Sequence, residues 1–193
     1  MNHILIAHTF KRLISTVLLV CAASTLHAQI VHIDVSGGLQ YFHGMSKKVG
    51  WDYNVGGRLL IFDNWYAAAL VHGGFSRGHY TGIYANEETQ LKHERDAFFL
   101  GVGPGYSIPL HKDWYATAQI LGGWGSIETT GNSKQKEVDD VDSHTFKGLS
   151  AASVIGVEYR IGSCAFGVNI TTQYIDQKLL PSLNLKCGLD FVL

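Results

Sequence analysis

The chain has few charged residues, few prolines and few cysteines. Asp, Glu, Lys and Arg make up 16% of its 193 residues, below the usual share of about 25%. The formal net charge is −1 and no basic stripe is interleaved with aromatic residues, which argues against a nucleic-acid partner. Three prolines stand against 22 glycines. This composition suits a β-barrel in lipid better than a soluble sandwich, and the length predicts one domain.

The N-terminal segment has the order of parts found in a secretory signal. Lys11 and Arg12 precede an apolar stretch, residues 13–23, which is too short for a spanning helix. Small residues follow, and the ending His-Ala-Gln is similar to signals common in Bacteroidota. We therefore expect cleavage between Ala28 and Gln29.

This cleavage would leave residues 1–28 as the signal peptide and residues 29–193 as the mature domain. A lipoprotein signal ending at Cys21 is the alternative, but Val20 is bulky for the position before a lipidated cysteine. After residue 28 no apolar run approaches the roughly 20 residues of a transmembrane helix. If the mature protein lies in a membrane, it must therefore be a closed barrel, because lipid tolerates no unpaired backbone.

Two cysteines remain after cleavage. Cys164 falls in a predicted turn and Cys187 in the middle of a predicted strand. In a hairpin of the last two strands we expect Cys187 opposite residues 170–172, well beyond the Cα separation of about 7 Å that a disulfide allows. Both cysteines are therefore predicted to be unpaired, with Cys187 facing lipid.

The last twelve residues, 182–193, alternate strictly between apolar and polar side chains. Period two predicts a strand with one apolar face, and the length matches the 9–11 residues or so that a tilted strand needs to cross a bilayer. The spacing of Lys186, Gly188, Phe191 and Leu193 resembles the C-terminal signal of bacterial outer-membrane barrels, which the barrel assembly machinery recognises. Leu193 stands where Phe is commoner in that signal.

Seven further segments show the same alternation, so eight strands are predicted. They cover residues 31–42, 51–62, 65–76, 96–108, 114–127, 146–161, 165–175 and 182–193. Pro104 cannot donate to a ladder, so we expect a local bulge there. Connections after the second, fourth and sixth strands are short, whereas residues 77–95 and 128–144 are long and polar. This asymmetry is typical of a barrel with both termini in the periplasm.

Aromatic residues gather at the ends of the predicted strands, as in two interfacial girdles. One set is Trp65, Trp114, Tyr159, Phe166 and Phe191, and the other is Tyr41, Trp51, Tyr53, Phe75, Trp124, Phe146 and Tyr174. The mature chain thus resembles the small eight-stranded outer-membrane proteins, such as the barrel of OmpA and OmpX. The resemblance implies an all-β, antiparallel, up-and-down transmembrane barrel in the bacterial outer membrane. Its expected surroundings are lipid and lipopolysaccharide, and it is expected to be a monomer.

Several charged residues share the polar, inward-facing parity of their strands. They are Asp34, Asp52, Arg58, Glu158, Arg160, Lys186 and Asp190. An eight-stranded barrel has an interior just wide enough for side chains, and unpaired charges are costly there. Two interpretations are open, a salt-bridge network that closes the barrel and a gated ion path. The near balance of positive and negative charges favours the salt-bridge network.

No cofactor, metal or catalytic site is predicted. His72 faces inward and is expected to be a hydrogen-bonded interior group. The loop histidines lack metal-ligand spacing, and the aspartates from 139 to 142 lack the glycine turn and terminal Glu of a calcium loop. The chain has no His-x-Ser sequence, a feature of barrel enzymes that deacylate lipid A. A lipid A-modifying enzyme and a soluble periplasmic lipocalin-like barrel are the two alternatives.

Overall fold

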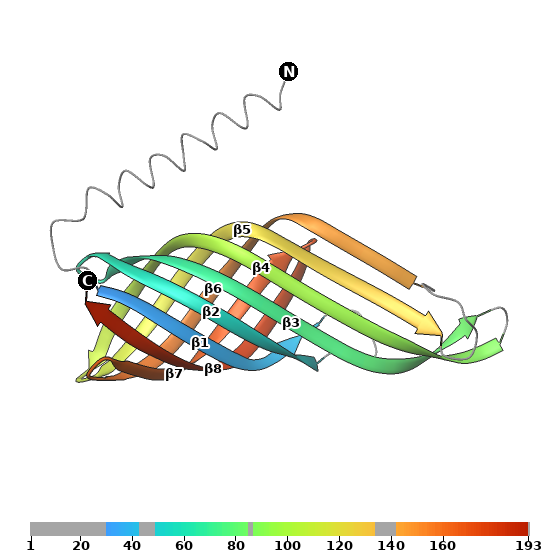
Figure 1. Cartoon of the computed structure of the whole chain (residues 1–193), viewed down its shortest axis with the longest axis horizontal. Helices are drawn as coiled ribbons and strands as arrows, with labels where there is room; N and C mark the ends of the chain where they lie inside the picture. The colour runs from blue at the N-terminus through green and yellow to red at the C-terminus, as the bar shows by residue number, and fades with distance from the viewer. Residues whose placement is uncertain (1–29, 43–48, 85–86, 134–141, 193) are drawn as a thin grey trace, which may run out of the picture.

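The computed structural model describes residues 30–42, 49–84, 87–133 and 142–192, with side chains described outside 80–91 and 131–143. Eight antiparallel strands follow one another around a closed ring (Figure 1). They are β1 (Ile30–Tyr41), β2 (Val49–Phe62), β3 (Trp65–Tyr84), β4 (Glu87–His111), β5 (Trp114–Ser133), β6 (Asp142–Ile161), β7 (Cys164–Ile175) and β8 (Lys178–Val192). β1 pairs with β8 from Ile30–Val192 to Gln40–Ser182, so the ring is closed along this length and leaves no open edge there. The predicted all-β up-and-down barrel is confirmed.

Alternation places apolar side chains outside and polar ones inside. Along β8, for example, Leu183, Leu185 and Leu189 are exposed, whereas Ser182 and Asn184 are buried. A soluble barrel carries its apolar face inward, so this inverse pattern fits a barrel whose solvent is hydrocarbon. Among the described residues no helix is long and apolar enough to cross a bilayer.

Two-residue turns join β2 to β3, β4 to β5 and β6 to β7 at one end of the barrel, here called the short-turn end. Asp63, Lys112 and Gly162 each have φ between 47° and 58° in these turns, the left-handed region that tight hairpins use. β8 ends at the same end, beside the start of β1 (Figure 1).

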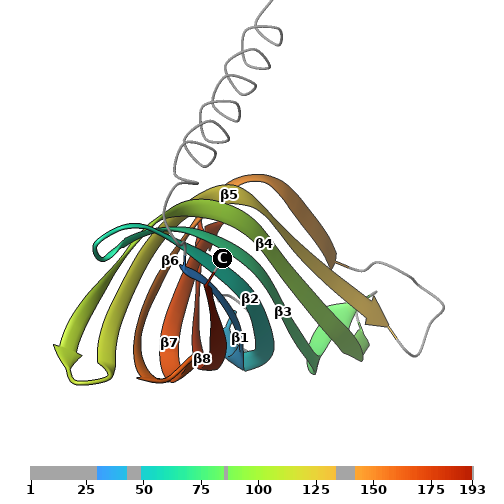
Figure 2. The same cartoon turned by 60° about the vertical axis from the view of Figure 1, so that its left-hand side comes forward.

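The two long polar segments are mostly strand, which corrects the prediction that they are loops. β3 and β4 stay paired from Trp65–Tyr106 out to Tyr84–Glu87, and β5 pairs with β6 as far as Gly131–Asp142. The alternation of apolar and polar residues did not predict these strand extensions. They stand outside lipid, where neither face of a strand has to be apolar. β3 to β6 therefore run on past the ends of the other four strands (Figures 1 and 2).

The predicted register of the last hairpin was wrong. Asp176 and Gln177 form a two-residue turn with φ of 51° and 58°, so β8 begins at Lys178 rather than at residue 182. This turn places Cys187 opposite Phe166, whereas Cys164 lies opposite Leu189. Both cysteines are nevertheless unpaired, and Cys187 is exposed on the outer face, as predicted.

Two smaller predictions also need correction. The ladder keeps one register on both sides of Pro104, and the irregularity of β4 lies at Pro109–His111 instead. Phe146 does not join a girdle, because it packs against the buried apolar cluster inside the barrel. The other aromatic residues predicted for that girdle lie towards the end opposite the short turns, here called the outer end, and are exposed.

Candidate functional site

Glu158 is the centre of a charged cluster inside the short-turn half of the barrel. It is fully buried and accepts two hydrogen bonds from Arg58, at 3.1 and 3.0 Å. Arg160 donates two more, from Nε at 2.9 Å and Nη2 at 2.6 Å, and the Lys186 ammonium donates a further one. β6 supplies Glu158 and Arg160, while β2 and β8 supply the cations that reach across the lumen. One carboxylate thus holds three cations from three strands.

A second part of the cluster crosses the seam where β1 meets β8. Asp34 lies 3.7 Å from Arg58 Nε and 3.5 Å from His32 Nε2. His32 Nδ1 lies 2.6 Å from Asp190, the residue directly opposite it on β8. His32 was absent from the predicted network, although it shares the inward parity of Asp34, which was the signal that could have found it.

The cluster is nearly neutral. Asp34, Glu158 and Asp190 face Arg58, Arg160 and Lys186. Tyrosine rings cover the two guanidinium groups, with Tyr115 centred 4.1 Å from Arg160 and Tyr66 centred 5.5 Å from Arg58. A nearly neutral cluster of paired charges closes a lumen rather than attracting an ion of either sign.

Asp52 lies apart from this cluster, which corrects its place in the predicted network. It is six positions along β2 from Arg58, towards the outer end, and therefore occupies another level of the barrel. Its carboxylate lies 3.7 Å from the His72 ring. His72 is fully buried and bonds to the Asn54 side chain, as expected for an interior histidine.

The rest of the interior is filled by side chains of two kinds. Hydrogen-bonded amides and hydroxyls come from β1, β2, β7 and β8, as in the Asn54–Ser36 bond of 3.0 Å and the Gln40–Gln173 bond of 3.3 Å. Buried apolar side chains come mainly from β3 to β6, with Phe42, Ile175 and Leu180 near the outer ends of their strands.

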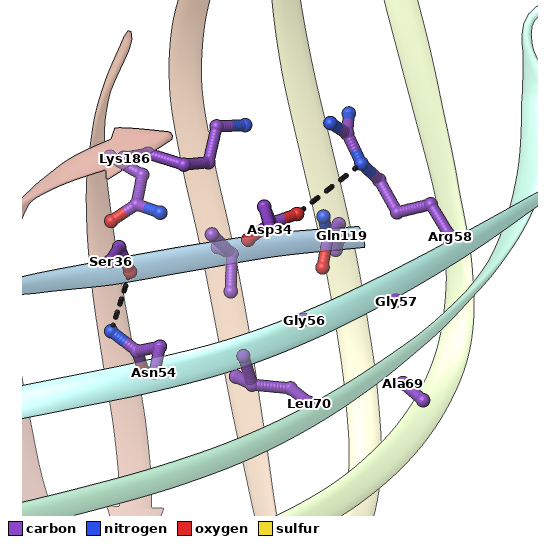
Figure 3. A pocket seen from close by; sticks show the side chains of 12 residues that line it. Asp34, Ser36, Asn54, Gly56, Gly57, Arg58, Ala69, Leu70, Gln119 and Lys186 are labelled. Carbon is purple, nitrogen blue, oxygen red and sulfur yellow. Dashed lines mark hydrogen bonds and ion pairs between the residues drawn. The ribbon is translucent and has the colours of Figure 1, made fainter. Parts of the chain in front are cut away.

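A cavity of about 10 Å³ lies between the charged cluster and the packed amide, hydroxyl and apolar side chains of the interior. It has room for about one water. Arg58 and Lys186 extend into the lumen on either side of Asp34 (Figure 3). At this level of the barrel the lumen is therefore filled by side chains, as expected for eight strands.

The assembly-signal residues lie on both faces of β8. Lys186 and Gly188 face inward, whereas Phe191 is exposed on the outer face. A Cβ at Gly188 would stand 2.4 Å from the His32 ring, so a side chain at this position would displace that ring. Leu193, Ala28 and Gln29 lie outside the described residues.

At the outer end, Asp176 joins the last hairpin to β6. Its carboxylate accepts hydrogen bonds from His144 Nε2 at 2.7 Å and Lys178 Nζ at 3.1 Å. The bond from His144, followed by that from Lys178, lowers the pKa of Asp176. Across the described part of the chain no group of three or more His, Cys, Asp or Glu could hold a metal ion.

The model of the outer membrane protein beta-barrel domain family matches residues 13–186, most of the chain. This protein belongs to the outer membrane β-barrel family. It is therefore an integral barrel of the bacterial outer membrane, and its apolar exterior is the surface that this family presents to lipid. No curated protein matches the sequence.

Solved structures share the fold of this outer-membrane barrel at low identity. Ail of Yersinia pestis is 12% identical, with a TM-score of 0.56 over 86% of this chain and 100% of Ail. OprG from Pseudomonas aeruginosa is 8% identical, with a TM-score of 0.53 over 85% of this chain and 96% of OprG. A major outer membrane protein from Thermus thermophilus is 9% identical, with a TM-score of 0.51 over 86% of this chain and 100% of that one.

Proposed function

We propose that the protein is a non-enzymatic barrel that binds a partner protein at the cell surface. The proposed binding element is the sheet formed by the outer parts of β3, β4, β5 and β6, here called the outer sheet. Both termini and the short turns would lie in the periplasm, so the outer sheet would stand outside the cell. The closed interior supports this proposal, because it leaves the outer sheet as the part available for a task.

One observation carries the proposal: among the described strands, the outer part of β3 pairs on one side only. Within the described ranges, β2 pairs with β3 up to Phe75, and residues 77–84 pair with β4 alone. Their free side presents a row of backbone donors and acceptors, which can receive a strand of another protein. Natural edge strands are usually protected by charges or proline, yet within residues 77–84 Arg77 is the one charged side chain and no proline occurs.

The opposite edge of the outer sheet is less suited to this role. Residues 142–150 of β6 pair with β5 alone among the described strands, but Asp142 and Lys147 interrupt this edge. The neighbouring sequence is acidic, with five acidic and two basic residues between positions 128 and 144. Ail was crystallised with the heparin analogue sucrose octasulfate, but this acidic balance disfavours such a polyanion here.

Selection of peptides from a displayed library on the purified barrel in nanodiscs tests the proposal. The expected result is enrichment of extended, β-prone peptides whose binding slows amide hydrogen exchange of residues 77–84. In the matched control, residues 81–90 are replaced by Asn-Gly, which keeps the Tyr80–Leu91 pairing and removes half of the edge. Peptides that bind both forms equally, or that protect other strands, would contradict the proposal.

Two other roles are separable by experiment. If the barrel only supports the envelope, the trimmed form should restore antibiotic resistance to a deletion strain as fully as the intact chain. If it modifies lipid A, purified protein incubated with lipid A should change the lipid's mass.

A further inference from the structure

The lipid-facing surface has a deep apolar groove near the short-turn end. It measures about 700 Å³ and runs across the outer faces of β2, β3 and β4, with Val31 of β1 at its margin. The large side chains that line it are Leu59, Ile61, Phe62, Trp65 and Val102. This groove is separate from the interior and from the outer sheet.

The groove exists because small residues are side by side on adjacent strands. The register places Gly57 opposite Ala69, and Ala67 between Leu59 and Pro104. A Cβ built at Gly57 would meet nothing within 4 Å, so the space over it is open. Further along β2 and β4 the outer face carries larger residues, such as Trp51, Val55 and Leu100. In a bilayer an unfilled hollow would forfeit dispersion contacts, so the groove requires an occupant.

The size and position of the groove favour a lipid chain over a protein surface. Its lining comprises 14 residues, fewer than the 20–30 or so that each side of a specific protein interface contributes. Its volume falls within the range of about 300–1,000 Å³ typical of small-molecule sites. With the short turns in the periplasm, as proposed above, the groove faces the inner leaflet, which consists of phospholipid.

The turn beside the groove indicates which kind of lipid headgroup would bind there. Phe62 and Trp65 both line the groove, and Asp63 lies between them in an exposed turn. Asp63 makes no ion pair with any residue that the structure describes. Its carboxylate therefore suits a cationic amine at the membrane surface.

We propose that this groove binds one phospholipid, with an acyl chain along Gly57 and Ala69 and an amine headgroup, of the phosphatidylethanolamine class, at Asp63.

Native mass spectrometry of the barrel, extracted from vesicles of equal phosphatidylethanolamine and phosphatidylglycerol, tests this assignment. The wild type should retain one phosphatidylethanolamine through mild delipidation. Gly57→Leu fills the groove and should reduce retention about tenfold, the equivalent of about 1.4 kcal/mol. Gly122→Leu is the matched control, because Gly122 is an outward glycine of β5 that is equally open and lies outside the groove. Ala69→Leu, with Ala118→Leu as its control, repeats the comparison if a leucine at a glycine position impairs folding.

Asp63→Asn should keep the retained lipid but abolish the preference for phosphatidylethanolamine. Equal retention by Gly57→Leu and Gly122→Leu would overturn the site. Equal retention of both lipids by the wild type would overturn the headgroup assignment. A wild-type dimer that Gly57→Leu converts to a monomer would show that a second copy fills the groove, and would also overturn the proposal.

Discussion

At the scale of single residues, the interior charged groups differ in how many partners each one holds. Glu158 is the only carboxylate that Lys186 and Arg160 bond among the described residues, and it holds both terminal nitrogens of Arg58. Arg160 is less buried, with 29% of its side chain exposed at the short-turn mouth. A change at the shared carboxylate therefore affects three cations, whereas loss of Arg160 leaves Glu158 with two.

We predict that Glu158→Gln lowers the free energy of unfolding by about 3–5 kcal/mol, the cost of leaving buried cations unpaired. Arg160→Ala should cost clearly less, because solvent reaches the group and Glu158 keeps Arg58 and Lys186. Urea unfolding in lipid vesicles measures both. Glu128→Gln on the exposed outer face is the control, and adding Lys186→Met to Glu158→Gln should recover part of the loss. Equal effects of Glu158→Gln and Arg160→Ala would contradict the shared-carboxylate arrangement.

At the scale of elements, the turn between β7 and β8 is strained by its side chains. Asp176 and Gln177 both have φ near +50° to +60°, a conformation that costs about 1–2 kcal/mol for an ordinary L-residue. Glycine adopts it freely but loses more entropy on folding.

Gln177→Gly should therefore raise the free energy of unfolding by about 0.5–1 kcal/mol. Gln177 is exposed and accepts or donates no described side-chain bond, so the change should act through the backbone alone. The urea midpoint in vesicles is the measurement, with Gln119→Gly in β5 as a control that should destabilise. A midpoint lowered by Gln177→Gly would rule out this account of the turn.

The last strand carries a second prediction at this scale. Removing residues 191–193 should sharply lower the amount of protein in the outer membrane, because Phe191 and Leu193 complete the proposed assembly signal. β8 also closes the ring, but Phe191 pairs with Val31 at its very end, so the shortened strand keeps most of the seam. Immunoblots of isolated membranes measure the effect, and unchanged levels would count against the signal.

At the scale of the whole molecule, orientation can be read from proteolysis of intact cells. Trypsin should cleave after Lys134 or Lys136, which lie between β5 and β6, and should spare Lys112 in the turn between β4 and β5. The reason is that the segment between β5 and β6 would lie outside the cell and the short turn inside. Cleavage at Lys112 alone would reverse the proposed topology.

The closed interior gives a second prediction for the whole barrel. Planar-bilayer recordings of the wild type should show no large steady conductance, because side chains fill the lumen and the cavity beside Asp34 and Lys186 is only about 10 Å³. A porin purified in the same detergent provides the positive control. A stable open channel of porin size would contradict a plugged interior.

The barrel and the facing of its side chains follow from the residue pattern alone. In lipid every backbone group must be paired, so strict alternation without a spanning helix leaves a closed antiparallel ring as the physical solution. The same period assigned Asp34, Arg58, Glu158 and Lys186 to the lumen. Tight-turn pairs such as Asp63-Asn64 then fixed the short-turn hairpins, because such turns set register locally.

Which of these residues meet, and how far the strands extend, became known from the three-dimensional arrangement of the strands. Contact across a lumen depends on the stagger of eight strands, which brought Arg58 of β2 and Lys186 of β8 to Glu158 of β6. The outer strands were missed because, outside lipid, a strand needs no apolar face. The groove at Gly57 and Ala69 arises from small residues on adjacent strands, and their coincidence depends on pairing register rather than on any one segment of sequence.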